Sequence, residues 1–363
     1  MSPLVEILRR LIAKTGPLSV AQYMGLALGH PQYGYYMHRD PLGKAGDFVT
    51  APEISQMFGE LIGLWCVVLW EQMGRPVPVL LTELGPGRGT LLADALRAGC
   101  AQPDFAAAVR VHLVETSPFL RKCQRTRLAA SHPGLVARWH DRLEHVPKPG
   151  PLLLVANEFF DALPIRQYVR TDVGWRERRI GLQPDGTGFA FVLEKIAEPD
   201  LPEGLGMVES GSVVETSADG VAIARAIGQR ITRHGGAALV IDYGYWRSAC
   251  GDTLQSVRRH AFHDVLDRPG DSDLTAHVDF AALVAAARSA GAHTYGPVAQ
   301  GVFLERLGIR ARAQRLLERA TSAQASSIAT AYHRLVHPAE MGLIFKVFAL
   351  VNPDLPPPPG FET

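Results

Sequence analysis

The stretch VLLTELGPGRGTL (residues 79–91) decides the fold. A strand-length apolar segment runs into a turn with three glycines at alternate positions, and a helical pattern follows. Such a turn lets backbone N–H groups approach a ligand closely, which predicts a nucleotide-like ligand at the strand end. The spacing is GxGxG, and Thr90 stands where a dinucleotide fingerprint has its third glycine. A plain strand-to-helix turn is the alternative, although it needs fewer glycines. The predicted cofactor-binding residues of the turn are Glu83, Gly85, Pro86, Gly87, Gly89 and Thr90.

Apolar stretches of strand length continue beyond this turn. They cover residues 109–115, 151–157 and 235–244, and helical patterns separate them. Near-continuous apolar strands that alternate with helices are typical of a parallel sheet covered on both faces. The sequence therefore predicts an α/β, Rossmann-like sheet, which also takes in residues 292–300 and 340–351.

Three parts of the chain are expected around this sheet. Residues 1–76 combine amphipathic and apolar helical patterns with an aromatic, glycine-rich loop, which predicts an N-terminal helical cap and lid. Residues 77–350 form the ligand-binding domain. A β-hairpin insertion near 165–205 is expected in it, because residues 165–196 alternate with a period of two around PDGTG. Residues 351–363 are a Pro-rich tail, expected to be extended and poorly ordered.

Acidic residues end the next two predicted strands. Glu115 lies about 26 residues beyond the glycine turn, a place suited to accepting hydrogen bonds from ribose hydroxyls. Asp141 follows the next strand and could accept from an adenine amino group. Solvated strand-end carboxylates are the alternative for both. Together with the glycine turn, the two acids favour recognition of adenosine.

A second polar segment follows the apolar strand at 151–157. Asn157, Glu158 and Asp161 belong at the carboxyl edge of the sheet, where open α/β sheets build their sites. Asp47 comes from a polar loop in the predicted lid. We take these four residues as candidates for the catalytic machinery, with Asn157 also a candidate for cofactor binding. The alternative is structural, because Asn157 and Asp161 could cap turns and Asp47 could cap the helix after it.

Composition excludes several classes of protein. The 37 Lys+Arg balance 36 Asp+Glu, so no excess of positive charge favours a nucleic acid partner. The four cysteines have no ligand spacing, and His260 and His263 lack a nearby third ligand, so no metal is expected. The P-loop motif is missing, which argues against a P-loop kinase or ATPase, and the GxSxG motif is missing, which weakens the case for a hydrolase.

No signal peptide is recognisable, and the longest apolar run (residues 61–70) is too short for a membrane span. We therefore expect a cytoplasmic protein without membrane insertion.

Several long motifs resemble the MidA family of class I S-adenosylmethionine-dependent methyltransferases. The resemblance extends from about residue 4 to residue 350. The motifs that carry it are GDFVTAPEISQMFGELIG (46–63), ELGPGRGTL (83–91), VETSP (114–118), ANEFFDALPI (156–165), IDYG (241–244), TLQSVRRH (253–260) and DLTAHVDF (273–280).

The resemblance implies a seven-stranded sheet and S-adenosyl-L-methionine as cofactor. Its methionine part would lie on the glycines at 85, 87 and 89, and Glu115 would hold its ribose. Mitochondrial members of the family are arginine methyltransferases that assist assembly of respiratory complex I and modify its 49 kDa-type subunit, which implies a protein substrate. A homodimer is compatible with the sequence. Because no transit peptide is recognisable, the sequence favours a bacterial protein.

Three alternatives stay open at this point. One is a methyltransferase for a small molecule or for another protein side chain. Another is an assembly chaperone that binds the cofactor with little catalysis. A nicotinamide dehydrogenase is disfavoured by the GxGxG spacing.

Overall fold

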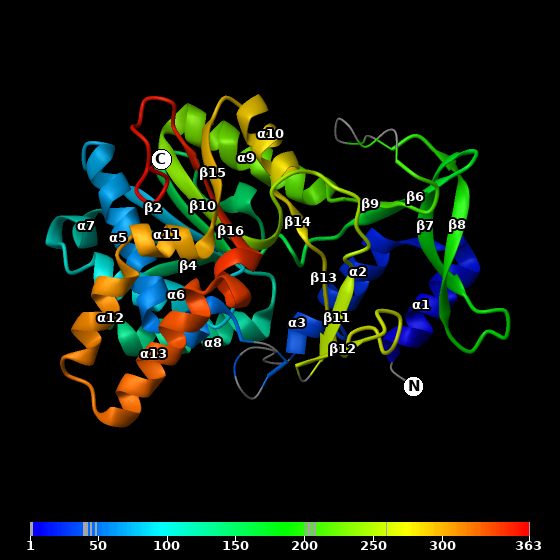
Figure 1. Cartoon of the computed structure of the whole chain (residues 1–363), viewed down its shortest axis with the longest axis horizontal. Helices are drawn as coiled ribbons and strands as arrows, with labels where there is room; N and C mark the ends of the chain where they lie inside the picture. The colour runs from blue at the N-terminus through cyan, green and yellow to red at the C-terminus, as the bar shows by residue number, and fades with distance from the viewer. Residues whose placement is uncertain are drawn as a thin grey trace.

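The structure is a computed structural model that describes residues 3–38, 43, 46–47, 49–199, 201, 205, 208–258 and 260–362. Figure 1 shows a large sheet wrapped by helices beside a smaller antiparallel sheet that carries the N-terminal helices. Parts of the predicted lid, namely residues 39–42, 44–45 and Phe48, lie outside the described residues, as does Arg259 of the motif at 253–260.

The large sheet has the strand order β15-β16-β10-β5-β2-β3-β4, and β14 pairs with β10 beside it. Neighbouring strands from β4 to β10 run parallel, whereas β16 is antiparallel to both β10 and β15. This arrangement confirms the predicted Rossmann-like sheet. Its strands are β2 (Val79–Leu84), β3 (Val109–Val114), β4 (Ala137–His140), β5 (Leu152–Asn157), β10 (Gly236–Tyr245), β14 (Val278–Asp279), β15 (His293–Ala299) and β16 (Phe345–Val351).

Both faces of this sheet are buried, which explains why its strands are apolar throughout. In β5, Leu153 and Val155 face one core, while Leu152 and Leu154 face the other. The first core includes residues of α5 (Gln56–Gln72), α6 (Thr90–Gly99), α7 (Pro103–Ala108), α8 (Pro118–Ser131), α11 (Gln300–Arg306), α12 (Ile309–Leu317) and α13 (Ser322–Val336). The second is covered by α9 (Ala218–His234) and α10 (Phe280–Ser289).

The smaller sheet extends the predicted hairpin. The turn PDGTG does join two antiparallel strands, β7 (Gly174–Leu182) and β8 (Phe189–Ala197), as predicted. However, β7 also pairs with β6 (Arg166–Thr171) and β1 (Leu18–Ser19), and β6 pairs with β9 (Val213–Thr216). The sequence pattern missed β1 and β9 because they are only two and four residues long.

The N-terminal helices bury this sheet rather than the large one. Leu4 and Leu8 of α1 (Pro3–Thr15) and Tyr23 of α2 (Val20–Gly29) pack with Ile180 and Phe189 of the small sheet. The helix α5, by contrast, packs on the large sheet. The domain boundaries at residues 76 and 350 stay predictions.

Short elements connect the two sheets. A third sheet has the order β12-β11-β13, from β11 (Gln255–Arg258), β12 (Ala261–His263) and β13 (Asp273–Thr275). The remaining short helices are α3 (Tyr35–His38), α4 (Ala51–Ile54), a 3₁₀ turn (Leu143–His145) and an irregular turn (Pro338–Gly342). In the described part of the chain, no helix has the length and apolar character needed to cross a bilayer.

The prediction of a poorly ordered C-terminal tail is wrong. Phe361 is buried, and its ring lies 5.3 Å from that of Phe303 in α11. The indole N–H of Trp65 donates to the carbonyl of Pro359 at 3.2 Å. The prolines keep the segment extended, but one aromatic anchor and one indole bond dock it on the core.

Candidate active site

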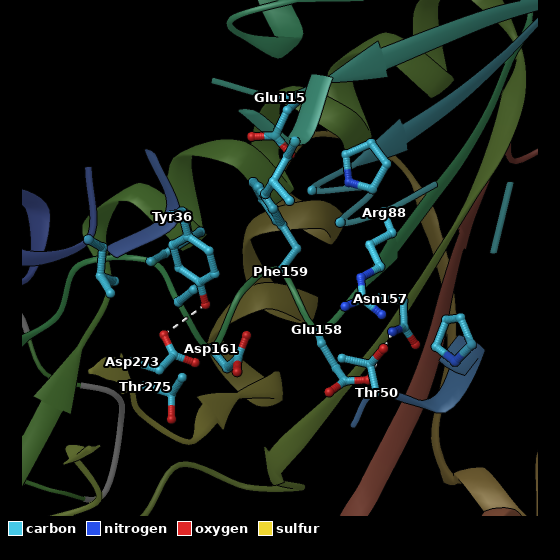
Figure 2. A pocket seen from close by; sticks show the side chains of 18 of the residues that line it. Tyr36, Thr50, Arg88, Glu115, Asn157, Glu158, Phe159, Asp161, Asp273 and Thr275 are labelled. Carbon is cyan, nitrogen blue, oxygen red and sulfur yellow. Dashed lines mark hydrogen bonds between the residues drawn. The ribbon is translucent and has the colours of Figure 1, made fainter. Parts of the chain in front are cut away.

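A cavity of about 360 Å³ opens at the carboxyl ends of β2, β3, β5 and β10. This is the edge at which open α/β sheets bind their ligands. Loops from the N-terminal region and the small β11–β13 sheet close its other side. Figure 2 shows its labelled side chains, with Glu115 at one end and the pair Asp161 and Asp273 away from it.

The glycine turn forms one wall of this cavity. Gly85, Gly87 and Gly89 have φ values of 59°, 53° and 78°, all in the left-handed region, and α6 begins at Thr90. A Cβ atom on Gly85 would come within 2.9 Å of the Phe159 ring. The turn therefore requires glycine for its backbone conformation, and at residue 85 also for space.

Glu115 follows β3 and lines the cavity as predicted. Its carboxylate accepts from the Ser117 N–H at 2.8 Å and from the Gln124 side-chain amide at 3.2 Å. The same Gln124 amide donates to the carbonyl of Gly87 at 2.8 Å, so it ties Glu115 to the glycine turn. Burial raises the pKa of Glu115 despite these bonds. The side chain is thus fixed beside the turn, where hydroxyl donors of a ligand could reach it.

Three buried oxygens that belong to cavity-lining residues have no hydrogen-bond partner in the described structure. They are Glu83 Oε2, Asn157 Oδ1 and Asp161 Oδ1. Burial, with the nearby charge of Glu115, raises the pKa of Glu83 to about 8. Buried acceptors without partners are costly, so they indicate a ligand that brings donors or positive charge. A sulfonium cofactor with an ammonium group and ribose hydroxyls fits this set.

The turn after β5 is held by a residue that sequence reasoning did not select. One carboxylate oxygen of Asp242, in β10, accepts from the backbone N–H groups of residues 159, 160 and 161 at 3.2, 3.0 and 3.2 Å. The other accepts from the Tyr243 N–H at 2.9 Å. Asp242 is fully buried, and burial raises its pKa. These bonds fix the backbone that carries Glu158 and Asp161.

Glu158 sits in this turn with φ of +50°, an unusual value for a residue with a side chain. Its carboxylate accepts from the Ala51 N–H at 3.2 Å and from the Asn157 side-chain amide at 3.0 Å. Burial, and next the charge of Asp161, raise its pKa to about 8. The structure thus brings Asn157, Glu158 and Asp161 together on the cavity wall, as predicted.

The far end of the cavity contains two further groups that were not predicted. Tyr36 donates its hydroxyl to Asp273 Oδ1 at 2.7 Å (Figure 2). The backbone carbonyl of Tyr36 accepts from the Ser117 hydroxyl at 2.6 Å. Burial, then the charge of Asp161, raise the pKa of Asp273 to about 7. Burial also raises the pKa of Asp161, to about 6.

Two predicted residues do not line the cavity. Asp141 forms an exposed ion pair with Arg121 at 2.7 Å, and Arg121 also donates to the Glu115 carbonyl. Asp47 accepts from the Tyr35 hydroxyl at 2.7 Å behind the cavity wall. The structure therefore separates both from the cluster that the sequence placed them in.

The predicted lid contributes a different acid. Glu53 accepts from the Thr90 hydroxyl and, at 3.3 Å, from Arg88, so it ties α4 to the start of α6. The missed residues Asp242, Tyr243 and Asp273 do lie in the motifs IDYG and DLTAHVDF. A polar residue directly after an apolar run of strand length, the pattern that indicated Asn157, would also have indicated Asp242.

The comparisons with known proteins agree with this geometry. Residues 61–298 match the family model of S-adenosyl-L-methionine-dependent methyltransferases. The chain is 41% identical to the Drosophila melanogaster homolog of protein arginine methyltransferase NDUFAF7, mitochondrial, over 96% of this chain and 84% of that protein. It is 38% identical to the Homo sapiens protein of that name, over 96% and 84%.

A solved structure covers nearly the whole chain. It is a Burkholderia thailandensis protein bound to S-adenosyl-homocysteine, 30% identical, with a TM-score of 0.83 over 99% of this chain and 92% of that one.

The chain belongs to the methyltransferase family whose model matches residues 61–298, and it is an S-adenosylmethionine-dependent methyltransferase. The resemblance inferred from the sequence is confirmed. The expectation of a cytoplasmic bacterial protein is contradicted, because the NDUFAF7 relatives are mitochondrial proteins.

Proposed function

We propose that this enzyme methylates an arginine side chain of a protein, and that the protein is a subunit of respiratory complex I. The observation that carries the proposal is the acidic lining of the cavity. Its described lining contains six acidic residues, Glu53, Glu83, Glu115, Glu158, Asp161 and Asp273, and one basic residue, Arg88, which is paired with Glu53. Burial raises the pKa of Glu83, Glu158 and Asp273, and a bound cation favours the ionised form of such carboxyl groups, so the site favours cationic ligands. The names of the relatives support arginine as the acceptor.

Within this proposal the cofactor lies against the glycine turn. The backbone at Gly85, Gly87 and Gly89 would hold its methionine part, and Glu115 would accept from its ribose hydroxyls. Glu83 and Asn157 offer their unpartnered oxygens to its donors. The bound cofactor supplies an electrophilic methyl group on a positively charged sulfur.

The acceptor side of the cavity then has two tasks. It must hold a planar guanidinium against the methyl group, and it must receive the proton that the attacking nitrogen gives up. Glu158 is suited to the second task, because burial raises its pKa to about 8, near the working pH. Asp161, three residues along the same turn, orients the acceptor. Asp47 does not line the cavity, but its charge adds to burial and to Asp161 in raising the pKa of Asp273.

Radiolabelled methyl transfer tests the proposal. The enzyme and labelled S-adenosylmethionine are added to an extract of cells that lack the gene, and the labelled product is identified by mass spectrometry. We expect methylarginine in a complex I subunit. Label on a small molecule or on another side chain would contradict the proposal. Absence of transfer, together with tight cofactor binding, would favour the chaperone alternative.

A further inference from the structure

We infer that Asp161 and Asp273 form a two-carboxylate subsite that binds the acceptor's guanidinium group. The inference rests on the proposed function for the identity of the acceptor. It adds a residue from outside the large sheet, Asp273, to the machinery that selects the substrate.

The two carboxylates come from different sheets whose backbones meet at this point, since the Ala276 N–H after β13 donates to the Asp161 carbonyl at 3.0 Å. Asp161 belongs to the turn after β5, on the large sheet, whereas Asp273 begins β13 in the three-stranded sheet. Both line the cavity, and they are only 6% and 4% exposed. Figure 2 shows the two side chains next to each other, away from Glu115. A flat cation between them would contact both layers of the protein.

Each carboxylate keeps an oxygen available for a ligand. Asp161 Oδ1 is buried and has no partner among the described residues. The hydrogen bonds recorded for Asp273 come from the Tyr36 hydroxyl and the Leu274 N–H, and both end on Oδ1. Its other oxygen faces Asp161 in Figure 2. Two buried carboxylates that face each other repel while both are ionised, so a bound cation would stabilise the ionised pair, which otherwise holds a proton.

The chemistry of the pair favours a guanidinium over an ammonium group. A guanidinium is planar, carries five N–H donors in a fixed fork and can bridge two carboxylates at once. Tyr36 holds Asp273 in place from the side opposite the open oxygen. Its backbone is in turn bonded to Ser117, two residues after Glu115. The subsite is therefore joined to the cofactor end by protein contacts but is distinct from it.

Calorimetry with a small arginine compound tests the subsite directly. The probe is Nα-acetyl-L-arginine methylamide, titrated up to 100 mM into the full-length enzyme saturated with S-adenosylhomocysteine. The matched neutral probe is the citrulline analogue, which has nearly the same shape. We expect saturable binding of the arginine compound. We also expect at least about tenfold weaker binding of the citrulline compound, because it lacks the charge that the pair neutralises.

Variants then locate the binding. Each of the variants Asp273→Asn and Asp161→Asn should bind the arginine compound about tenfold more weakly, or weaker still. The affinity for S-adenosylhomocysteine should stay within twofold of the wild type. Retained cofactor affinity also shows that each variant folds. The control is Asp267→Asn, an exposed aspartate before the same strand, which should change neither affinity.

Four binding results would overturn the inference. They are no saturable binding to the wild type, equal binding of the citrulline analogue, wild-type binding in Asp273→Asn, and loss of cofactor affinity in that variant. The last, in a variant whose urea unfolding shows that it is folded, would assign Asp273 to the cofactor. If the arginine compound binds as expected but labelling finds no methylarginine, the subsite stands and the proposed function fails. If Asp273→Asn methylates arginine with wild-type kinetics, the function stands and the subsite fails.

Discussion

The buried carboxylate of Asp242, in β10, accepts a hydrogen bond at 3.0 Å from the backbone N–H of Phe160, in the turn after the neighbouring strand β5. The same oxygen receives the two flanking N–H groups. One side chain thus holds three consecutive amides of the turn that presents Glu158 and Asp161. The turn needs such support, because Glu158 has a left-handed backbone conformation that costs about 1–3 kcal/mol.

The first prediction concerns this support. Asp242→Asn leaves one acceptor oxygen where the carboxylate has two, so the turn should lose part of its anchoring. We expect the free energy of unfolding to fall by about 1–3 kcal/mol. Methyl transfer should fall by about a hundredfold, the scale of a 1 Å misplacement of a reacting group. Denaturant unfolding and single-turnover transfer measure the two effects.

The control for Asp242 is Asp219→Asn, an exposed aspartate in the first turn of α9. It should leave transfer unchanged. An Asp242→Asn enzyme that is destabilised but transfers methyl groups at the wild-type rate would show that Asp242 serves stability alone.

The second prediction concerns the glycine turn. Gly87→Val places a branched side chain where φ is +53°, at the cavity wall. Gly134→Val is a matched control, because Gly134 has φ of +85° and open space around it. Both variants should lose about 1–2 kcal/mol of stability through backbone strain. Calorimetry should show loss of S-adenosylhomocysteine binding in Gly87→Val alone. Equal affinities in the two variants would remove Gly87 from the cofactor site.

The sequence predicted the parts of this protein that depend on local pattern. The strand at 79–84 and the left-handed turn after it follow from apolar residues and alternating glycines, and the structure has both at those positions. Residues that act through tertiary contacts were harder to find. Asp273 belongs to a three-residue strand, and its role appears only when Tyr36, far away in sequence, comes within 2.7 Å. The burial of Phe361 likewise depends on its contact with Phe303, which the local sequence does not indicate.

The third prediction separates catalysis from turn capping at Glu158. In Glu158→Gln, the amide oxygen can still accept from Ala51 and Asn157, so the shape of the turn should persist. The variant cannot take a proton, and transfer should fall by about a hundredfold or more. Cofactor affinity should stay unchanged. If Glu158 only caps the turn, the variant should instead lose about 1 kcal/mol of stability and keep its rate.

The last prediction concerns pH. The pKa values of Glu83 and Glu158 are each raised to about 8, mainly by burial, from an ordinary value of 4.5. Between pH 4.5 and 8 the native ligand-free protein therefore holds protons that the unfolded chain has released. Its stability must fall as pH rises through this window, by at most about 1.4 kcal/mol per pH unit for each group.

Measurements between pH 6.5 and 8 avoid the opposite contribution of the buried His112, whose pKa is lowered to about 4 from 6.5. Asp273, whose pKa is raised to about 7, contributes to the fall in the same sense as the two glutamates. Urea unfolding at pH 6.5, 7.0, 7.5 and 8.0 should show a falling free energy in the wild type. The fall should be shallower in Glu158→Gln, which has one carboxyl group fewer to titrate. Glu144→Gln, on the exposed 3₁₀ turn after β4, should keep the wild-type slope. If the Glu158→Gln slope equals that of the wild type, Glu158 is already ionised in the native state and cannot be the group that takes the proton with a raised pKa.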